Sequence, residues 1–329
     1  SFLIFFILIA ISNYYFKIYQ KGLLPIYDLN FLFSGTYKWL LLFGLTTISS
    51  IIIFLETNVF KKFFITSSIL IFFETFLSSF SMLSRGMIFN AFALLFGIYK
   101  FSNKLNIPNK LTYYLKSLSI IFVLFYISVA SVNYIRANYF YVGKSSEFAY
   151  DVFKKKTEKK EFDKVKKNYS NLDQHHSEIY YLIINRWVGV DGVMAVISKK
   201  EILNKTFLIN SFKERADAKR PTFYEIKFNL DTIDYSEQTY SNVKGNTLPG
   251  IIAFLFYSGS YYFLFFTLFI ICILASIIEY LAFKLSCNNL IFSALIGQVI
   301  SFRLIHFGYL PNQSHLLFGT IIITIFFVY

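Results

Sequence analysis

Long apolar segments constrain this chain more than any other feature of its sequence. Hydrophobic residues make up 56% of its 329 residues. A helix needs about 20 apolar residues to cross a hydrocarbon core of about 30 Å, and several runs approach or reach that length. We therefore expect an all-α polytopic membrane protein with about eight transmembrane helices. The expected spans lie near residues 1–16, 37–55, 63–80, 86–100, 112–133, 249–272, 288–302 and 314–329.

One long polar stretch interrupts the apolar runs. It divides the chain into N-terminal transmembrane helices (1–133), a large and mostly helical external loop (134–248) and C-terminal transmembrane helices (249–329). The sequence begins with Ser1 rather than Met and ends within an apolar run, which leaves room for additional helices beyond either end.

The formal net charge of +13 does not indicate a nucleic-acid partner. The loop holds 20 Lys and Arg against 15 Asp and Glu, and so contributes only +5 of this charge. The remaining charge is spread over short connections, as expected beside anionic lipid headgroups.

Residues 179–198 are unusually apolar for an external loop. Their apolar side chains recur at helical spacing, and Gly189 and Gly192 interrupt the pattern. We expect this segment to pack onto the membrane face of the helix bundle or to lie in the membrane interface.

Arginine is scarce in this chain, with six arginines against 26 lysines. A planar guanidinium can bind phosphate or carboxylate through two parallel hydrogen bonds, which lysine cannot do. The alternation of the expected spans also places all six on the same side of the membrane. These residues are Arg85, Arg136, Arg186, Arg215, Arg220 and Arg303.

Arg85 precedes an apolar run, where it is either an interfacial anchor or a ligand for a lipid-linked phosphate. Arg186 and Asp191 share the apolar part of the loop. A charge in such surroundings needs a partner, so either the two pair with each other, or Arg186 binds a substrate phosphate while Asp191 orients it.

Arg303 and His306 are three residues apart and share one face of an expected helix, with His315 near the start of the last span. His306 is a candidate general base, since histidine titrates near neutrality, or else an ordinary interfacial histidine. Glu74 is the one carboxylate well inside an expected span. It could pair with Arg85 or Arg303, act as a base, or carry protons in a transporter.

Several familiar sites have no counterpart in this sequence. There is no P-loop pattern, no Cys/His metal spacing and no Asp-x-Asp pair. We therefore expect no cofactor and no metal, and a reaction on a lipid-borne donor rather than on a nucleotide.

Three short elements, in this order, resemble the bacterial O-antigen polymerases, which join oligosaccharide repeat units. The elements are Ser84-Arg85-Gly86 at a helix start, Asn185-Arg186-Trp187-Val188-Gly189-Val190-Asp191-Gly192 in the loop, and Leu248-Pro249-Gly250 before a span that contains Tyr257-Ser258-Gly259-Ser260. The resemblance covers the layout from about residue 37 to residue 329.

The resemblance implies a glycosyltransferase of the bacterial inner membrane with a periplasmic active face. Its donor and acceptor are undecaprenyl-pyrophosphate-linked glycans, and its partners are membrane lipids, a flippase and a chain-length regulator. On this reading Arg85, Arg186 and Arg303 bind pyrophosphate with help from Arg215 or Arg220.

Under the same resemblance His306 is the first choice of base and Glu74 the second. Asp191 and His315 support the site, and Trp187 offers a flat face for a sugar ring. An O-antigen ligase, a polysaccharide or lipid transporter (flippase) and a membrane scaffold remain alternatives.

Overall fold

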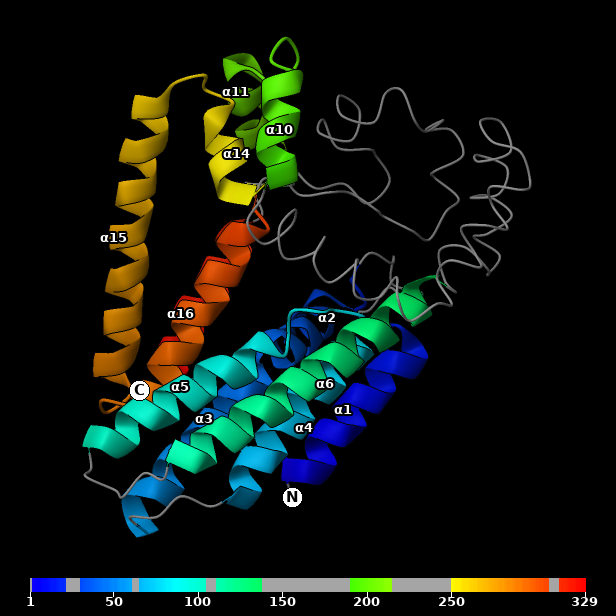
Figure 1. Cartoon of the computed structure of the whole chain (residues 1–329), viewed down its shortest axis with the longest axis vertical. Helices are drawn as coiled ribbons and strands as arrows, with labels where there is room; N and C mark the ends of the chain where they lie inside the picture. The colour runs from blue at the N-terminus through cyan, green and yellow to red at the C-terminus, as the bar shows by residue number, and fades with distance from the viewer. Residues whose placement is uncertain are drawn as a thin grey trace. The chain divides into compact units, whose positions relative to one another are not determined.

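The computed structural model describes residues 2–21, 30–60, 65–104, 111–137, 190–214, 250–307 and 314–329 (Figure 1). Within these ranges the chain is mostly helical and contains no strand. It forms two compact units. The first comprises Ser1–Asn133, Ala275–Ile300 and Thr320–Tyr329, and the second comprises Tyr134–Leu274 and Ser301–Gly319.

The helices of the first 137 residues follow one another with short connections. They are α1 (Phe2–Phe16), α2 (Phe31–Trp39), a π-helical turn η1 (Leu40–Gly44), α3 (Leu45–Phe60), α4 (Ile65–Ser81), α5 (Phe89–Lys104) and α6 (Leu111–Ala137). The loop contributes α10 (Val190–Ser198) and α11 (Lys205–Lys213). The remaining helices are α14 (Gly250–Phe256), α15 (Tyr261–Leu285), α16 (Leu290–Ile305) and α17 (Ser314–Val328).

Among the residues that the structure describes, three helical segments are long and apolar enough to cross a membrane: Leu32–Phe60, Tyr114–Val132 and Tyr261–Leu285. Four shorter helices in the same ranges are also apolar: Phe2–Phe16, Leu70–Ser81, Leu290–Ile305 and Ser314–Val328. The prediction of a helical membrane protein is consistent with these lengths, whereas the count of about eight spans is not confirmed.

The span expected at 249–272 is wrong. Residues 257–260 separate the short α14 from α15, which continues to Leu285, well beyond the end expected at residue 272. Gly259 has a φ of +71°, a conformation that favours glycine, and the Ser258 hydroxyl accepts a hydrogen bond from the Ser260 N–H at 3.2 Å. This local turn ends α14 before the apolar run is complete.

The π-helical turn η1 widens the helix between α2 and α3. A Cβ at Gly44 would lie 3.0 Å from ring atoms of Trp39, so glycine leaves room for that ring. The Trp39 Nε1 donates to the Thr324 hydroxyl of α17 at 3.0 Å. The Leu42 carbonyl accepts from the Asn90 amide at 3.0 Å. Side chains distant in sequence thus hold the turn at both sides.

A buried asparagine joins the ends of α1 and α4. The Asn13 amide nitrogen lies within hydrogen-bond distance of the Ser81 carbonyl (3.0 Å) and hydroxyl (2.8 Å), and its carbonyl accepts from the Tyr19 N–H at 2.7 Å. The backbone adds a bond from Lys21 N–H to the Met82 carbonyl at 2.9 Å. These bonds fix the turn that carries Arg85, which follows Met82 by three residues.

α5 and α16 cross at very close range. A Cβ at Gly97 would lie 2.6 Å from the Ile291 Cα and 3.0 Å from the Leu290 carbonyl oxygen. Only glycine allows the two backbones to approach this far, as small residues do at many helix crossings in membranes.

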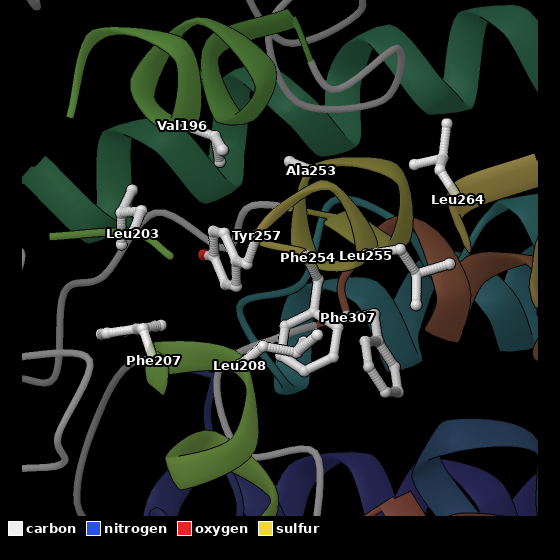
Figure 2. Close-up of a cluster of buried hydrophobic side chains, with 10 residues drawn as sticks. All are labelled: Val196, Leu203, Phe207, Leu208, Ala253, Phe254, Leu255, Tyr257, Leu264 and Phe307. Carbon is white, nitrogen blue, oxygen red and sulfur yellow. The ribbon is translucent and has the colours of Figure 1, made fainter. Parts of the chain in front are cut away.

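The second unit has its own apolar core, which joins the loop helices α10 and α11 to α14 (Figure 2). Its members are Val196, Leu203, Phe207, Leu208, Ala253, Phe254, Leu255, Tyr257, Leu264 and Phe307, and we call this set the α14 cluster. Phe254 lies near its centre, with ring centroids 5.5 Å from Tyr257 and 5.1 Å from Phe307.

Candidate functional sites

The C-terminal end of α16 brings two of the predicted site residues together in the second unit. Arg303 lies in the last turn of α16, and its Nη2 donates to the hydroxyl of Ser314 at 3.2 Å. Ser314 is the buried first residue of α17. The guanidinium is therefore oriented between the end of one apolar helix and the start of the next.

His306 follows Arg303 by three residues and is half-buried. Its Nδ1 lies 3.0 Å from the Phe302 carbonyl oxygen, and its ring packs on Phe302 with centroids 4.4 Å apart. A carbonyl oxygen only accepts hydrogen bonds, so Nδ1 carries the hydrogen in this contact. In the neutral imidazole the proton-accepting nitrogen is then Nε2, as a general base requires.

The turn that carries His306 is held by the α14 cluster. The Phe307 carbonyl accepts from the Gly250 N–H at 3.1 Å, and the Phe307 ring meets Phe254 edge to face. Gly250 has a φ of +81°, and a Cβ there would lie 3.1 Å from the Ile305 carbonyl oxygen. A glycine at position 250, in the Leu248-Pro249-Gly250 element, therefore allows the start of α14 to form a hydrogen bond with Phe307, just after the end of α16.

His315 is the second residue of α17, next to the serine that receives the Arg303 hydrogen bond. Its side chain is exposed. The structure thus places Arg303 in the last turn of α16, His306 directly after the last residue of that helix, and His315 in the first turn of α17.

Arg85 lies in the first unit, in the turn between α4 and α5, and its side chain is half-buried. The turn is sharply bent, because the buried Leu83 has a φ of +51° and the Ser84 N–H bonds to the Ser79 carbonyl at 2.9 Å. An arginine at the end of a serine-rich helix fits both readings from the sequence, an interfacial anchor and a phosphate ligand.

Glu74 is fully buried in the first unit, with no exposed surface. The Ser78 hydroxyl donates to its Oε1 at 2.9 Å, and the Thr46 hydroxyl of α3 donates to its Oε2 at 3.3 Å. An arginine was one partner considered for Glu74, but the structure gives its carboxyl two hydroxyl partners. The Ser78 hydroxyl belongs to the same helix, and the Thr46 hydroxyl joins α4 to α3. A sugar hydroxyl could reach Glu74 only if α3 and α4 moved apart.

Four predicted site residues, Arg186, Trp187, Arg215 and Arg220, lie outside the described residues. Asp191 is the second residue of α10. The roles given to these five residues stay predictions.

Sequence reasoning did not find Ser314 or Thr46 as partners. Both are small hydroxyl residues in apolar helices, so neither stands out in a sequence until its neighbour in space is known. No group of three or more His, Cys, Asp or Glu residues that could hold a metal ion occurs in the described ranges.

Comparisons of this chain with protein-family models, with curated proteins and with solved structures found no significant match.

Proposed function

We propose that this chain polymerises lipid-linked oligosaccharide repeat units of a bacterial surface polysaccharide. The observation that carries the proposal is the pair of Arg303 and His306 in one turn at the end of the apolar helix α16, with Arg303 oriented by Ser314. A cation beside a base at the end of an apolar helix suits a substrate whose phosphate is attached to a lipid.

The proposed reaction transfers the growing glycan to the next repeat unit. A hydroxyl oxygen of the acceptor sugar forms a bond to the anomeric carbon of the donor, and the bond from that carbon to the pyrophosphate oxygen breaks. The bonding electron pair leaves with undecaprenyl pyrophosphate. His306 Nε2 takes the proton of the attacking hydroxyl, and Arg303 stabilises the negative charge that develops on the leaving pyrophosphate.

The other predicted residues complete this proposal. Arg85 and Arg186 bind pyrophosphate, and Arg215 and Arg220 assist from the loop. Glu74, enclosed by two hydroxyls, is the second choice of base. The active face is periplasmic in the inner membrane, and chain length is set by a partner protein.

The test is complementation of a deletion strain, followed by electrophoresis of its surface polysaccharide. We expect wild type to restore the ladder of polymer lengths, and Arg303→Ala and His306→Ala to leave only core with a single repeat unit. Arg303→Lys keeps the charge but loses the planar guanidinium, so it should restore the ladder only in part. Arg186→Ala tests the loop in the same assay.

A matched control is Lys284→Ala, which removes a cation from the last turn of α15. That lysine lies over the rings of Tyr280 and Phe283, at 5.8 and 5.9 Å from their centroids, so its loss should leave the ladder intact. All variants must be present in the membrane at the wild-type level. Bare core with accumulated lipid-linked polymer would identify a ligase, and an unchanged ladder in the deletion strain would refute both activities.

A further inference from the structure

The loop helices α10 and α11 have apolar side chains on two sides. The inner side contributes Val196, Leu203, Phe207 and Leu208 to the α14 cluster. The Asn204 side chain caps the start of α11 by accepting from the Phe207 N–H at 3.1 Å, so the connection between the two helices is well defined. Burial of these inner side chains explains why residues 190–214 fold against α14. It does not explain why the two helices carry further apolar side chains that are exposed.

The outer side exposes further large apolar residues. On α10, Met194 and Ile197 are 62% and 50% exposed and lie three residues apart, so they share a face of the helix. On α11, Ile209 is 46% exposed. Phe212 is 52% exposed, but its ring packs edge to face on Phe254 of the α14 cluster, with centroids 5.3 Å apart, so it lies at the border between the two sides. We call Met194, Ile197 and Ile209 the outer apolar side chains. In an external loop surrounded by water, they would be an unfavourable surface.

The α14 cluster ties these helices to a membrane-spanning segment. Leu264, in the first turn of α15, is a buried member of the cluster, and Leu268 and Ile271 pack against it. A helix rises 1.5 Å per residue, so Ile271 lies about 15 Å along α15 from its first residue. α15 is 25 residues long and is the most apolar of the three candidate spans in the described ranges. The loop helices therefore pack on the same cluster as the first turns of a span.

Aromatic residues mark the level at which α15 enters the membrane. Tyr261 and Tyr262 begin the helix and are 63% and 91% exposed. Tyrosine is enriched at the boundary between water and lipid, where its ring is apolar and its hydroxyl is hydrated. Lysines accompany the outer apolar side chains: Lys200, Lys205 and Lys213 are exposed around α10 and α11. Such side chains can extend their ammonium groups to lipid phosphates.

We propose that α10 and α11 bind the membrane surface beside the start of α15, with the outer apolar side chains among the lipid acyl chains. Amphipathic helices in this position bury their apolar face about 5–10 Å into the boundary between headgroups and acyl chains. The lysines then lie at the level of the phosphates. The inference depends on α15 spanning a membrane, and it holds whichever reaction the chain catalyses.

This placement has a consequence for the end of α16. Phe307 belongs to the same cluster and follows His306 directly. The turn that holds Arg303 and His306 is thus attached to a core fixed at the membrane boundary, which is the depth at which the phosphate of a lipid-linked substrate is found.

The test measures which side chains contact lipid in the full-length protein in nanodiscs. Cys272 and Cys287 both carry exposed thiols, so both are replaced by serine before single cysteines are introduced for labelling with an environment-sensitive fluorophore. The labelled positions are Ile197→Cys and Ile209→Cys on the outer side, with Glu201→Cys in the exposed connection as the control. Each is quenched either by lipids brominated on the acyl chain or by iodide in the water.

We expect brominated lipid to remove most of the fluorescence at positions 197 and 209 and little at 201, with iodide showing the reverse order. Equal iodide quenching at all three positions, with none by brominated lipid, would overturn the proposal. A second measurement avoids the labels: p-benzoylphenylalanine in place of Met194, which is 62% exposed, is irradiated in intact cells. A phospholipid adduct supports the proposal, and an adduct to another protein in place of lipid overturns it.

Discussion

Replacement of Gly97 by alanine tests the close crossing of α5 and α16. The added Cβ would lie 2.6 Å from the Ile291 Cα and 3.0 Å from the Leu290 carbonyl oxygen, both of which are backbone atoms. Ordinary van der Waals contact begins at 3.4 Å. The helices must therefore separate by about 0.8 Å, the difference between 3.4 and 2.6 Å. A flexible side chain could move aside, but a helix backbone cannot do so alone.

Two opposing effects set the size of the change. Overpacking a well-packed core costs about 1–3 kcal/mol, and the separation also weakens dispersion contacts along the crossing. Alanine has a higher helix propensity than glycine by up to about 1 kcal/mol, which offsets part of this cost. We expect Gly97→Ala to lower the free energy of unfolding by about 1–2 kcal/mol.

The assay is equilibrium unfolding of the purified protein in mixed micelles, with increasing SDS and helical circular dichroism as the signal. Gly97→Ala should unfold at a lower SDS fraction than wild type. Gly35→Ala and Gly319→Ala are matched controls, because both glycines lie in helices and a Cβ at either would meet nothing within 4 Å. The controls should be neutral or slightly stabilising. If Gly97→Ala unfolds at the same SDS fraction as the two control variants, the close crossing is not a feature of the folded protein.

Substitutions at three further positions address the buried polar contacts and a helix cap. Glu74→Gln keeps an oxygen that accepts from one hydroxyl and places an NH2 donor beside the other hydroxyl, which can turn to accept, so it should retain the fold. Glu74→Ala leaves both hydroxyls without this partner and should cost about 2–4 kcal/mol. Asn13→Ala removes the bonds that join α1 to α4 and should cost about 2–3 kcal/mol. Asn204→Ala removes the cap of α11 and should cost about 1 kcal/mol, and Asn204→Asp should restore most of it.

The same SDS titration measures the substitutions of Glu74 and Asn13, since both residues belong to the first unit. Protease cleavage within residues 190–214 is a better probe for Asn204, because only the α10–α11 region should loosen. If Glu74→Ala were as stable as Glu74→Gln, the two hydroxyl bonds would have no part in holding α3 to α4. Loss of polymer in Glu74→Gln with the fold intact would favour a proton-transfer role for the carboxyl.

The sequence by itself determined the class of fold and the approximate position of most helices. The length of an apolar run sets where a helix can cross a bilayer, because a helix satisfies its own backbone hydrogen bonds. The sequence placed Tyr257-Ser258-Gly259-Ser260 inside a span and predicted no break there. The break at 257–260 moved the long span from 249–272 to Tyr261–Leu285, because a local serine–glycine turn overrides the apolar run around it.

The candidate site was predicted only as single residues. The spacing of Arg303 and His306 predicted a shared face of one helix, whereas α16 ends at Ile305 and His306 follows its last residue. The bond from Arg303 to Ser314, the bonds of Glu74 to Thr46 and Ser78, and the contact of Gly250 with Phe307 were decided by the tertiary structure. Serine, threonine and glycine are common in apolar helices and have no distinctive pattern. Their partners become defined only when packing brings separate helices within hydrogen-bond distance of each other.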